Sequence, residues 1–132
     1  MSMERIQELA REGFCCSQIM VILALEASGR EEPGLVQAMH AYGWGLYSQE
    51  LCGTLAGAVA VLSLFDKNGD DLLMIPELVR WFKQAFGGAN CREIIGEGCR
   101  DFSGCLPIMA ASFAKVRELL NENGILLEEW DG

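Results

Sequence analysis

The 132-residue chain is short of basic residues, and this scarcity limits its partners. It has 10 lysines and arginines against 19 acids, which gives a formal charge of −9. Nucleic acids and anionic membrane surfaces attract proteins through clustered positive charge, so the composition argues against both as partners. Because 51% of the residues are hydrophobic and 22% are charged, we expect a globular protein.

Long apolar segments are also missing. The longest one, residues 51–65, has 15 residues and includes two glycines, a threonine and a serine. A helix needs about 20 apolar residues to cross a bilayer, so this segment is predicted to be a buried helix. The first 14 residues have mixed charge and lack the apolar core of a signal peptide. The expected location is therefore the cytoplasm, a reducing compartment.

No stretch alternates apolar and polar residues as a strand would, and no repeat or linker divides the chain. We predict one all-α domain over residues 1–132, a bundle of about five to seven helices with cysteines at converging helix N-termini. The boundaries follow from capping residues, glycines and prolines. Helices are expected over residues 2–12, 16–27, 34–42, 48–65, 76–86, 91–96 and 105–121.

The six cysteines follow none of the common short motifs. C-x-x-C is absent, which excludes a thioredoxin-type motif and a zinc ribbon, and so is the C-x-x-C-H motif of haem attachment. A chain of this length can bury a core without disulfides. In a reducing compartment, cysteines are more often reactive or metal-binding than structural, so these six need another explanation.

Four of the cysteines stand at the start of a predicted helix: Cys16, Cys52, Cys91 and Cys105. A helix N-terminus offers free N–H groups and a partial positive charge, which favour the thiolate, the form that attacks disulfides and ligates metals. A buried cysteine can also be a simple apolar side chain, but four at matching positions favour a shared site.

Glycines in the predicted 48–65 helix give a second indication. Gly53 and Gly57 lie on one face of it, and glycine inside a helix usually marks a close approach of backbones. A neighbouring helix could pack against this face and bring its own cysteine to Cys52.

These residues resemble a redox-active protein family named for its C-GCAxxG-C-C pattern. The resemblance rests on Cys16, the segment Cys52-Gly53-Thr54-Leu55-Ala56-Gly57, Cys91 and Cys105, in that order. Gly13 to Gln18 is similar to the family's G-x-N-C-A-[QE] start, with Cys15 where asparagine is frequent. Gly43-Trp44-Gly45, Phe86-Gly87 and Asn90-Cys91-Arg92-Glu93 are similar to further family segments, whereas Cys99 is an extra cysteine. The resemblance implies that the same four cysteines form a redox or metal-binding site.

Two mechanisms fit four clustered sulfurs. In the first, Cys16, Cys52, Cys91 and Cys105 ligate an iron–sulfur cluster for electron transfer, or zinc. In the second, two cysteines cycle between dithiol and disulfide, and the catalytic candidates are Cys52 and Cys16. Cys52 is the expected attacker, on the premise that its glycines leave the sulfur accessible. A bridge between Cys99 and Cys105 is a further option.

A reading without redox chemistry stays open: a structural zinc-binding or protein-interaction module. With redox activity the protein would be an oxidoreductase or an electron-transfer protein, served by a redox partner protein whose identity the sequence does not give. The apolar, small-residue helix at Cys52 also predicts a homodimer.

Two remaining features are weaker candidates. The single histidine, His40, could assist a thiol or act as a ligand, although a lone histidine is more often structural. Residues 66–77 place oxygen-bearing side chains at loop positions 1, 3, 5 and 12 of an EF-hand, but position 6 is Asp71, where the loop needs glycine. This favours an acidic turn over a calcium site.

Overall fold

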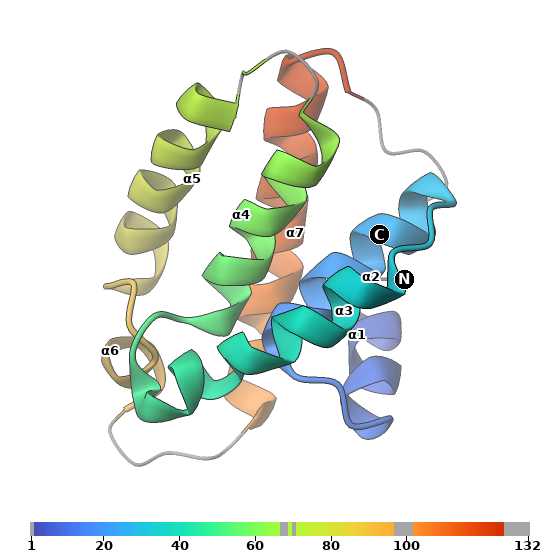
Figure 1. Cartoon of the computed structure of the whole chain (residues 1–132). Helices are drawn as coiled ribbons and strands as arrows, with labels where there is room; N and C mark the ends of the chain where they lie inside the picture. Colours follow the sequence, from blue (N-terminus) through green and yellow to red (C-terminus); the bar gives the residue numbers. More distant parts are fainter. Residues whose placement is uncertain (1, 67–68, 70, 97–101, 126–132) are drawn as a thin grey trace.

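The computed structural model describes residues 2–66, 69, 71–96 and 102–125, and in these residues the protein is all-α, as predicted (Figure 1). The α-helices are α1 (Ser2–Arg11), α2 (Cys16–Ser28), α3 (Pro33–Met39), α4 (Gly53–Phe65), α5 (Asp71–Phe86), α6 (Cys91–Ile95) and α7 (Leu106–Glu122). Three short helical turns are η1 (His40–Tyr42), η2 (Gly45–Gln49) and η3 (Phe102–Cys105). None of the described helices is long and apolar enough to cross a membrane.

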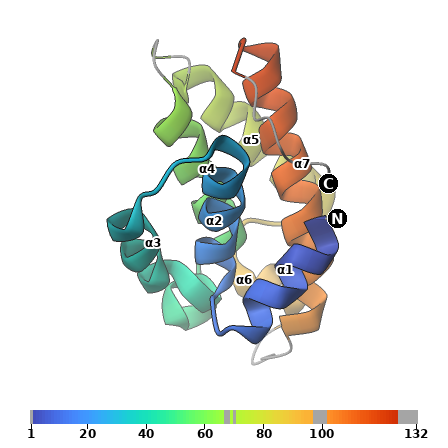
Figure 2. The same cartoon turned by 90° about the vertical axis from the view of Figure 1, so that its right-hand side faces the viewer.

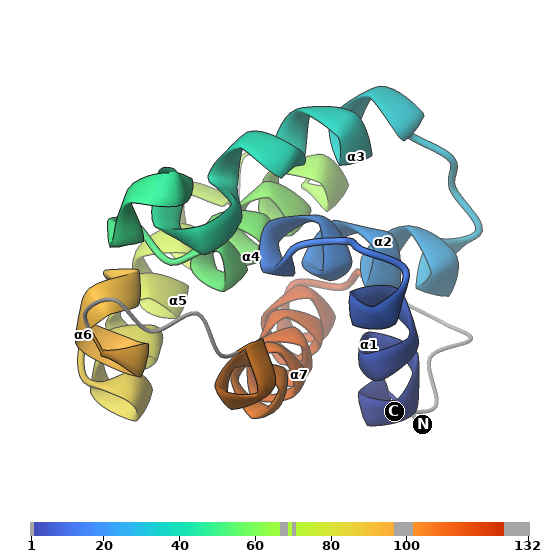
Figure 3. The ribbon, with the colours of Figure 1, turned by 90° about the horizontal axis from the view of Figure 1, so that it is seen from below.

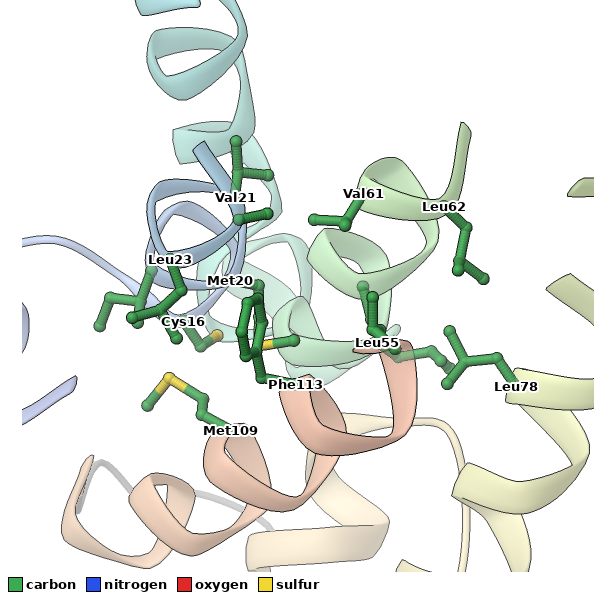
Figure 4. Close-up of a cluster of buried hydrophobic side chains, with 14 of the residues drawn as sticks. Cys16, Met20, Val21, Leu23, Leu55, Val61, Leu62, Leu78, Met109 and Phe113 are labelled. Atoms are coloured by element: carbon green, nitrogen blue, oxygen red, sulfur yellow. The ribbon is translucent and has the colours of Figure 1, made fainter. Parts of the chain in front are cut away.

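The central helix is α4, which packs against α2, α5 and α7. Figure 1 shows α4 and α7 side by side, and Figure 2 shows α1 beside α7. Both α2 and α4 carry apolar residues around most of their circumference, so each is buried on several sides rather than along one stripe. The core that they form includes Cys16 at the start of α2, whose side chain lies near Met20 of the same helix and Met109 of α7 (Figure 4).

The predicted close approach on the glycine face of α4 is confirmed. A Cβ atom added to Gly57 would lie 2.7 Å from the carbonyl oxygen of Ser17, and one added to Gly53 would lie 2.5 Å from Cys16 Sγ. Side chains at these two positions would collide with α2, so only glycine permits the observed spacing. The helix that packs here is therefore the one that carries Cys16.

Three predicted helix boundaries are wrong. The helix expected from residue 48 begins at Gly53, because Gln49 has a φ of 55°, outside the right-handed helical region, and Leu51 forms an isolated antiparallel bridge with Asn90. The helix expected over residues 34–42 ends at Met39 and continues as the tighter turn η1.

The third error concerns α5, which begins at Asp71, so Pro76 lies inside the helix rather than in its first turn. Proline inside a helix removes one backbone hydrogen bond. A helix that begins at Asp71 also occupies the second half of the loop that an EF-hand would need. Two of the candidate calcium ligands, Asn68 and Asp70, lie outside the described residues.

Candidate functional site

Five cysteines line one narrow, mainly apolar cavity of about 20 Å³. Figure 3 views the molecule from the end at which α6 and the first turn of α7 lie. The lining residues come from the starts of α2, α4 and α7, from α6, and from the start of η2 with the residue before it: Cys15, Cys16, Trp44, Gly45, Cys52, Gly53, Thr54, Cys91, Ile94, Ile95, Cys105 and Ile108. The structure thus brings the four predicted cysteines together and adds Cys15. All five are free thiols, and Cys99 lies outside the described residues.

The predicted position of the four cysteines at helix starts is confirmed. Cys16 and Cys91 are the first residues of α2 and α6. Cys52 and Cys105 are the N-caps of α4 and α7. Each sulfur is therefore placed near the unpaired N–H groups of a first helical turn.

Burial of Cys52 reverses the expected effect of the helix start on its thiol. Its side chain is only 9% exposed, so the premise that glycines leave the sulfur accessible is wrong. Desolvation raises the pKa of Cys52, and the N–H groups of Leu55 and Thr54 together with the Thr54 hydroxyl act in the opposite direction. These donors face the sulfur without completing a hydrogen-bonded cap.

The pKa of the Cys16 thiol is also raised by burial. Desolvation, followed by the charges of Cys52, Cys15 and Cys105, raises the pKa of Cys16 from 9.0 to about 12, against a smaller lowering by the Trp44 N–H. The Cys16 thiol is therefore protonated at neutral pH. The helix N-terminus does not overcome the loss of water around the sulfur.

The raised pKa of Cys16 predicts a loss of stability at alkaline pH. Below about pH 9 the thiol is protonated in both the folded and the unfolded chain, and its contribution is fully present. Between pH 9 and about 12 only the unfolded chain ionises, so the free energy of unfolding should fall as pH rises through this window. Urea unfolding of the wild type and of Cys16→Ala, under reductant, measures the effect. A fall that is equally steep in both proteins would contradict it.

Cys15 is half-buried and caps α2. Gln18 Oε1 accepts the backbone N–H of Cys15 at 3.2 Å, and Cys15 Sγ lies 3.2 Å from Ser17 Oγ. The Gln18 bond belongs to a capping box between Cys15 and Gln18, in which asparagine or serine usually holds the first position. The sequence indicated only that Cys15 stands at a position where asparagine is frequent, and its placement on the cavity was missed.

A left-handed turn forms one wall of the cavity. Trp44, Gly45, Leu46 and Tyr47 all have φ between 51° and 62°. Left-handed backbone costs roughly 1–2 kcal/mol for each residue other than glycine, so other contacts must hold this turn.

Arg92, on α6, holds the residues that directly follow the turn, Ser48 to Glu50. Its Nε donates to the Gln49 carbonyl at 3.2 Å, and its guanidinium forms an ion pair with Glu50. The Gln49 side chain in turn donates to the Gly96 carbonyl at 3.0 Å. The turn and α6 are thus held together at the side of the cavity.

Two backbone hydrogen bonds fix Cys91 relative to Cys52. The Cys91 N–H donates to the Glu50 carbonyl at 2.6 Å, and the Cys52 N–H donates to the Ala89 carbonyl at 2.8 Å. Asn90 and Glu93 form a capping box at the start of α6, in which Glu93 Oε1 accepts the Asn90 N–H at 3.0 Å. The start of α6 is therefore positioned both by its own cap and by backbone hydrogen bonds to residues distant in the sequence.

His40 does not line the cysteine cavity. It borders a separate, open pocket, where the Tyr47 hydroxyl lies 2.9 Å from His40 Nε2. Of the predicted roles for His40, direct contact with a metal held in the cysteine cavity has no support in this geometry.

The donor set of the cavity suits the predicted metals, but its geometry and volume do not. Several thiols in an apolar setting suit soft metals such as zinc and iron. Among the described residues, however, no three side chains of histidine, cysteine, aspartate or glutamate are arranged to hold a metal ion. A volume of about 20 Å³ is close to the ~10–15 Å³ that a single water needs, so a cluster of several iron and sulfur atoms would require the cavity to widen.

Comparison with known proteins gave one family match. The family model described as "Putative redox-active protein (C_GCAxxG_C_C)" matches residues 14–119, which include every cysteine of the chain. No curated protein and no solved structure matched. The match spans most of the sequence and bears out the resemblance noted from its motifs. The chain belongs to the C_GCAxxG_C_C family of redox-active proteins.

Proposed function

We propose that this protein carries out thiol–disulfide redox chemistry and that its inner dithiol is the pair Cys16 and Cys52. The observation that supports this pairing is the contact between α2 and the start of α4. A Cβ on Gly53, the residue after Cys52, would lie 2.5 Å from Cys16 Sγ. Among the neighbouring charged groups, Cys52 has the largest effect on the pKa of the Cys16 thiol.

The surroundings of the pair suit a protected disulfide. Oxidation removes two electrons and two protons from the two thiols and passes them to a disulfide acceptor, which becomes two thiols. When the protein disulfide is reduced again, the Thr54 and Leu55 N–H groups and the Thr54 hydroxyl can stabilise Cys52 as the departing thiolate. In the reduced protein at rest, burial keeps both thiols protonated. The reduced form is therefore not stabilised as a thiolate, and the pair should not be a strong oxidant.

A metal centre is the second candidate function, and the convergence of five thiols on one cavity favours it. Cys16, Cys52, Cys91 and Cys105 would be the ligands. Zinc would supply a structural cross-link, and an iron–sulfur cluster would supply electron transfer. Both need the sulfurs to move from their present positions, because no ligating group of three is formed by the described residues.

The experiment that separates the two functions starts from anaerobically purified full-length protein. Iron and zinc are measured, and free thiols are counted before and after treatment with a small disulfide oxidant. We expect metal-free protein that loses two thiols on oxidation and regains them with reductant. Stoichiometric iron or zinc, with a thiol count that does not change on oxidation, would contradict the dithiol function.

The small-residue face of α4, on which the predicted homodimer was based, is already covered. Gly53 and Gly57 pack against α2 of the same chain, so this face of α4 is not available to a second copy. Dimerisation stays a prediction, as do the redox partner protein and the cytoplasmic location.

A further inference from the structure

The proposed inner pair raises the question of how a substrate reaches it. The Cys16 and Cys52 side chains are 8% and 9% exposed, so a reagent in solution meets little of either sulfur. Cys15 is more exposed than both and lines the same cavity. It is also the cysteine that lines a second, open pocket of about 390 Å³ on the neighbouring side of Trp44. Cys15 therefore connects the enclosed cavity with a pocket that opens to solvent.

The open pocket has the size and the groups of a small-ligand site. Its volume falls in the range of about 300–1,000 Å³ typical of such sites. Phe14 and Trp44 supply apolar surface, and the Tyr47 hydroxyl and the His40 ring form a hydrogen-bonded pair on one wall. Arg11, at the end of α1, supplies a cation.

Arg11 is available for an anion. It has no ion-pair partner among the residues that the structure describes. The nearby carboxylates of Glu8 and Glu12 lie within 3.9 and 3.7 Å of Arg5, which engages them. In a chain with a net charge of −9, an uncommitted arginine beside a thiol is a specific feature rather than part of a basic surface.

We propose that this open pocket binds small disulfides that carry a carboxylate near the sulfur, and that Cys15 is the residue with which they first exchange. The inference rests on the proposed dithiol function and adds to it a substrate class and an outer thiol. Arg11 would bind the carboxylate, and the aromatic side chains would hold the aliphatic part of the ligand.

The exchange balances in three steps. The Cys15 thiolate attacks one sulfur of the ligand, the ligand S–S bond breaks, and half of the ligand leaves as a thiolate that takes a proton from solvent. A second cavity thiol, other than the adjacent Cys16, then attacks Cys15 Sγ and releases the other half as a thiol. Exchange within the cavity moves the disulfide to Cys16 and Cys52 and returns Cys15 to a thiol. One ligand disulfide is reduced to two thiols, and two protein thiols become one disulfide.

The test uses two probes of opposite charge, 3,3′-dithiodipropionate and cystamine. Full-length protein is mixed with each, quenched in acid over time and analysed by mass spectrometry. The wild type should first gain a single adduct on Cys15. Each rate is divided by that of the same probe with free cysteine, because the two probes release thiols of different pKa. On this scale the protein should react about fivefold faster with the anionic probe, the size of effect that roughly 1 kcal/mol of exposed ion pairing produces. Without the Arg11 contact, the net charge of −9 would favour cystamine instead.

Two variants make the test specific. Cys15→Ser should keep the fold, because serine is a preferred N-cap, and should oxidise the inner pair at least about tenfold more slowly with dithiodipropionate. Arg11→Gln should lose the preference for the anionic probe and keep the adduct on Cys15. A first adduct on another cysteine, or oxidation of Cys15→Ser at the wild-type rate, would overturn the inference.

The same experiment distinguishes a failure of this inference from a failure of the dithiol function on which it rests. If Cys15→Ser reacts normally while Cys16 and Cys52 still form a disulfide, the outer thiol is wrong and the dithiol function stands. If the wild type gains the Cys15 adduct but never forms an internal disulfide, the dithiol function is wrong and the binding pocket stands.

Discussion

Replacing Gly53 by alanine is expected to lower the free energy of unfolding by about 3 kcal/mol. The added Cβ would lie 2.5 Å from Cys16 Sγ and 2.8 Å from the Tyr42 carbonyl oxygen. The second of these neighbours is backbone, which cannot turn aside as a side chain can. The start of α4 would therefore have to move away from α2, which would also separate Cys52 from Cys16. Urea unfolding under reductant measures the loss.

Gly34→Ala is the matched control. Gly34 lies in α3, and no atom lies within 4 Å of the position that its Cβ would take. Alanine in a helix is more favourable than glycine, so this variant should be stabilised by up to about 1 kcal/mol. If both variants unfolded at the same urea concentration, the close packing of α2 on α4 would be wrong.

Replacing either Cys16 or Cys52 by serine is expected to abolish the Cys16–Cys52 disulfide that oxidation forms, since each variant leaves its partner without that sulfur to bridge. The measurement is peptide mapping of the disulfides together with a free-thiol count before and after oxidation. Serine in a buried position costs roughly 1–3 kcal/mol if its hydroxyl finds no partner, so thermal unfolding should first show that the variants are folded.

Cys91→Ser is the informative comparison for this pair. Cys91 is 6% exposed and lines the same cavity, so the change matches the other two in burial and chemistry. In a dithiol protein this variant should still lose two thiols on oxidation. A Cys91→Ser protein that failed in the same way as the other two would instead favour four ligands around a metal.

The helices of the fold could be predicted largely from local sequence. The limits of α2 and the starts of α6 and α7 follow from capping residues and glycines close by in the chain. The left-handed turn could not be predicted, because Trp44, Leu46 and Tyr47 favour right-handed or extended backbone. The residues that directly follow the turn are held by Arg92, more than forty residues later, and no local pattern predicts such a contact.

The site shows the same division between local and tertiary causes. The convergence of Cys16, Cys52, Cys91 and Cys105 could be predicted, because a cysteine at each helix start and a glycine face on α4 are both visible in the sequence. The protonation of the thiols could not. Desolvation depends on which helices cover a sulfur, and it reversed the direction expected from the helix N-terminus.

The placement of Cys15 could not be predicted from the sequence either, for a related reason. In the sequence it is only a neighbour of Cys16 and a departure from a frequent asparagine. Its placement between two pockets depends on how the left-handed turn and η1 fold around the start of α2.

The central claim is that Cys16 and Cys52 form the redox-active pair, and disulfide mapping tests it most directly. Metal-free protein is oxidised with a small disulfide, the remaining thiols are alkylated in acid-quenched samples, and proteolytic peptides are analysed by mass spectrometry with and without reduction. The account predicts one internal disulfide that joins the peptide containing Cys15 and Cys16 to the peptide containing Cys52, and the same link in the Cys15→Ser variant, where Cys16 is the only cysteine of its peptide. A disulfide that consistently joined other cysteines, or both thiols alkylated after full oxidation, would contradict it.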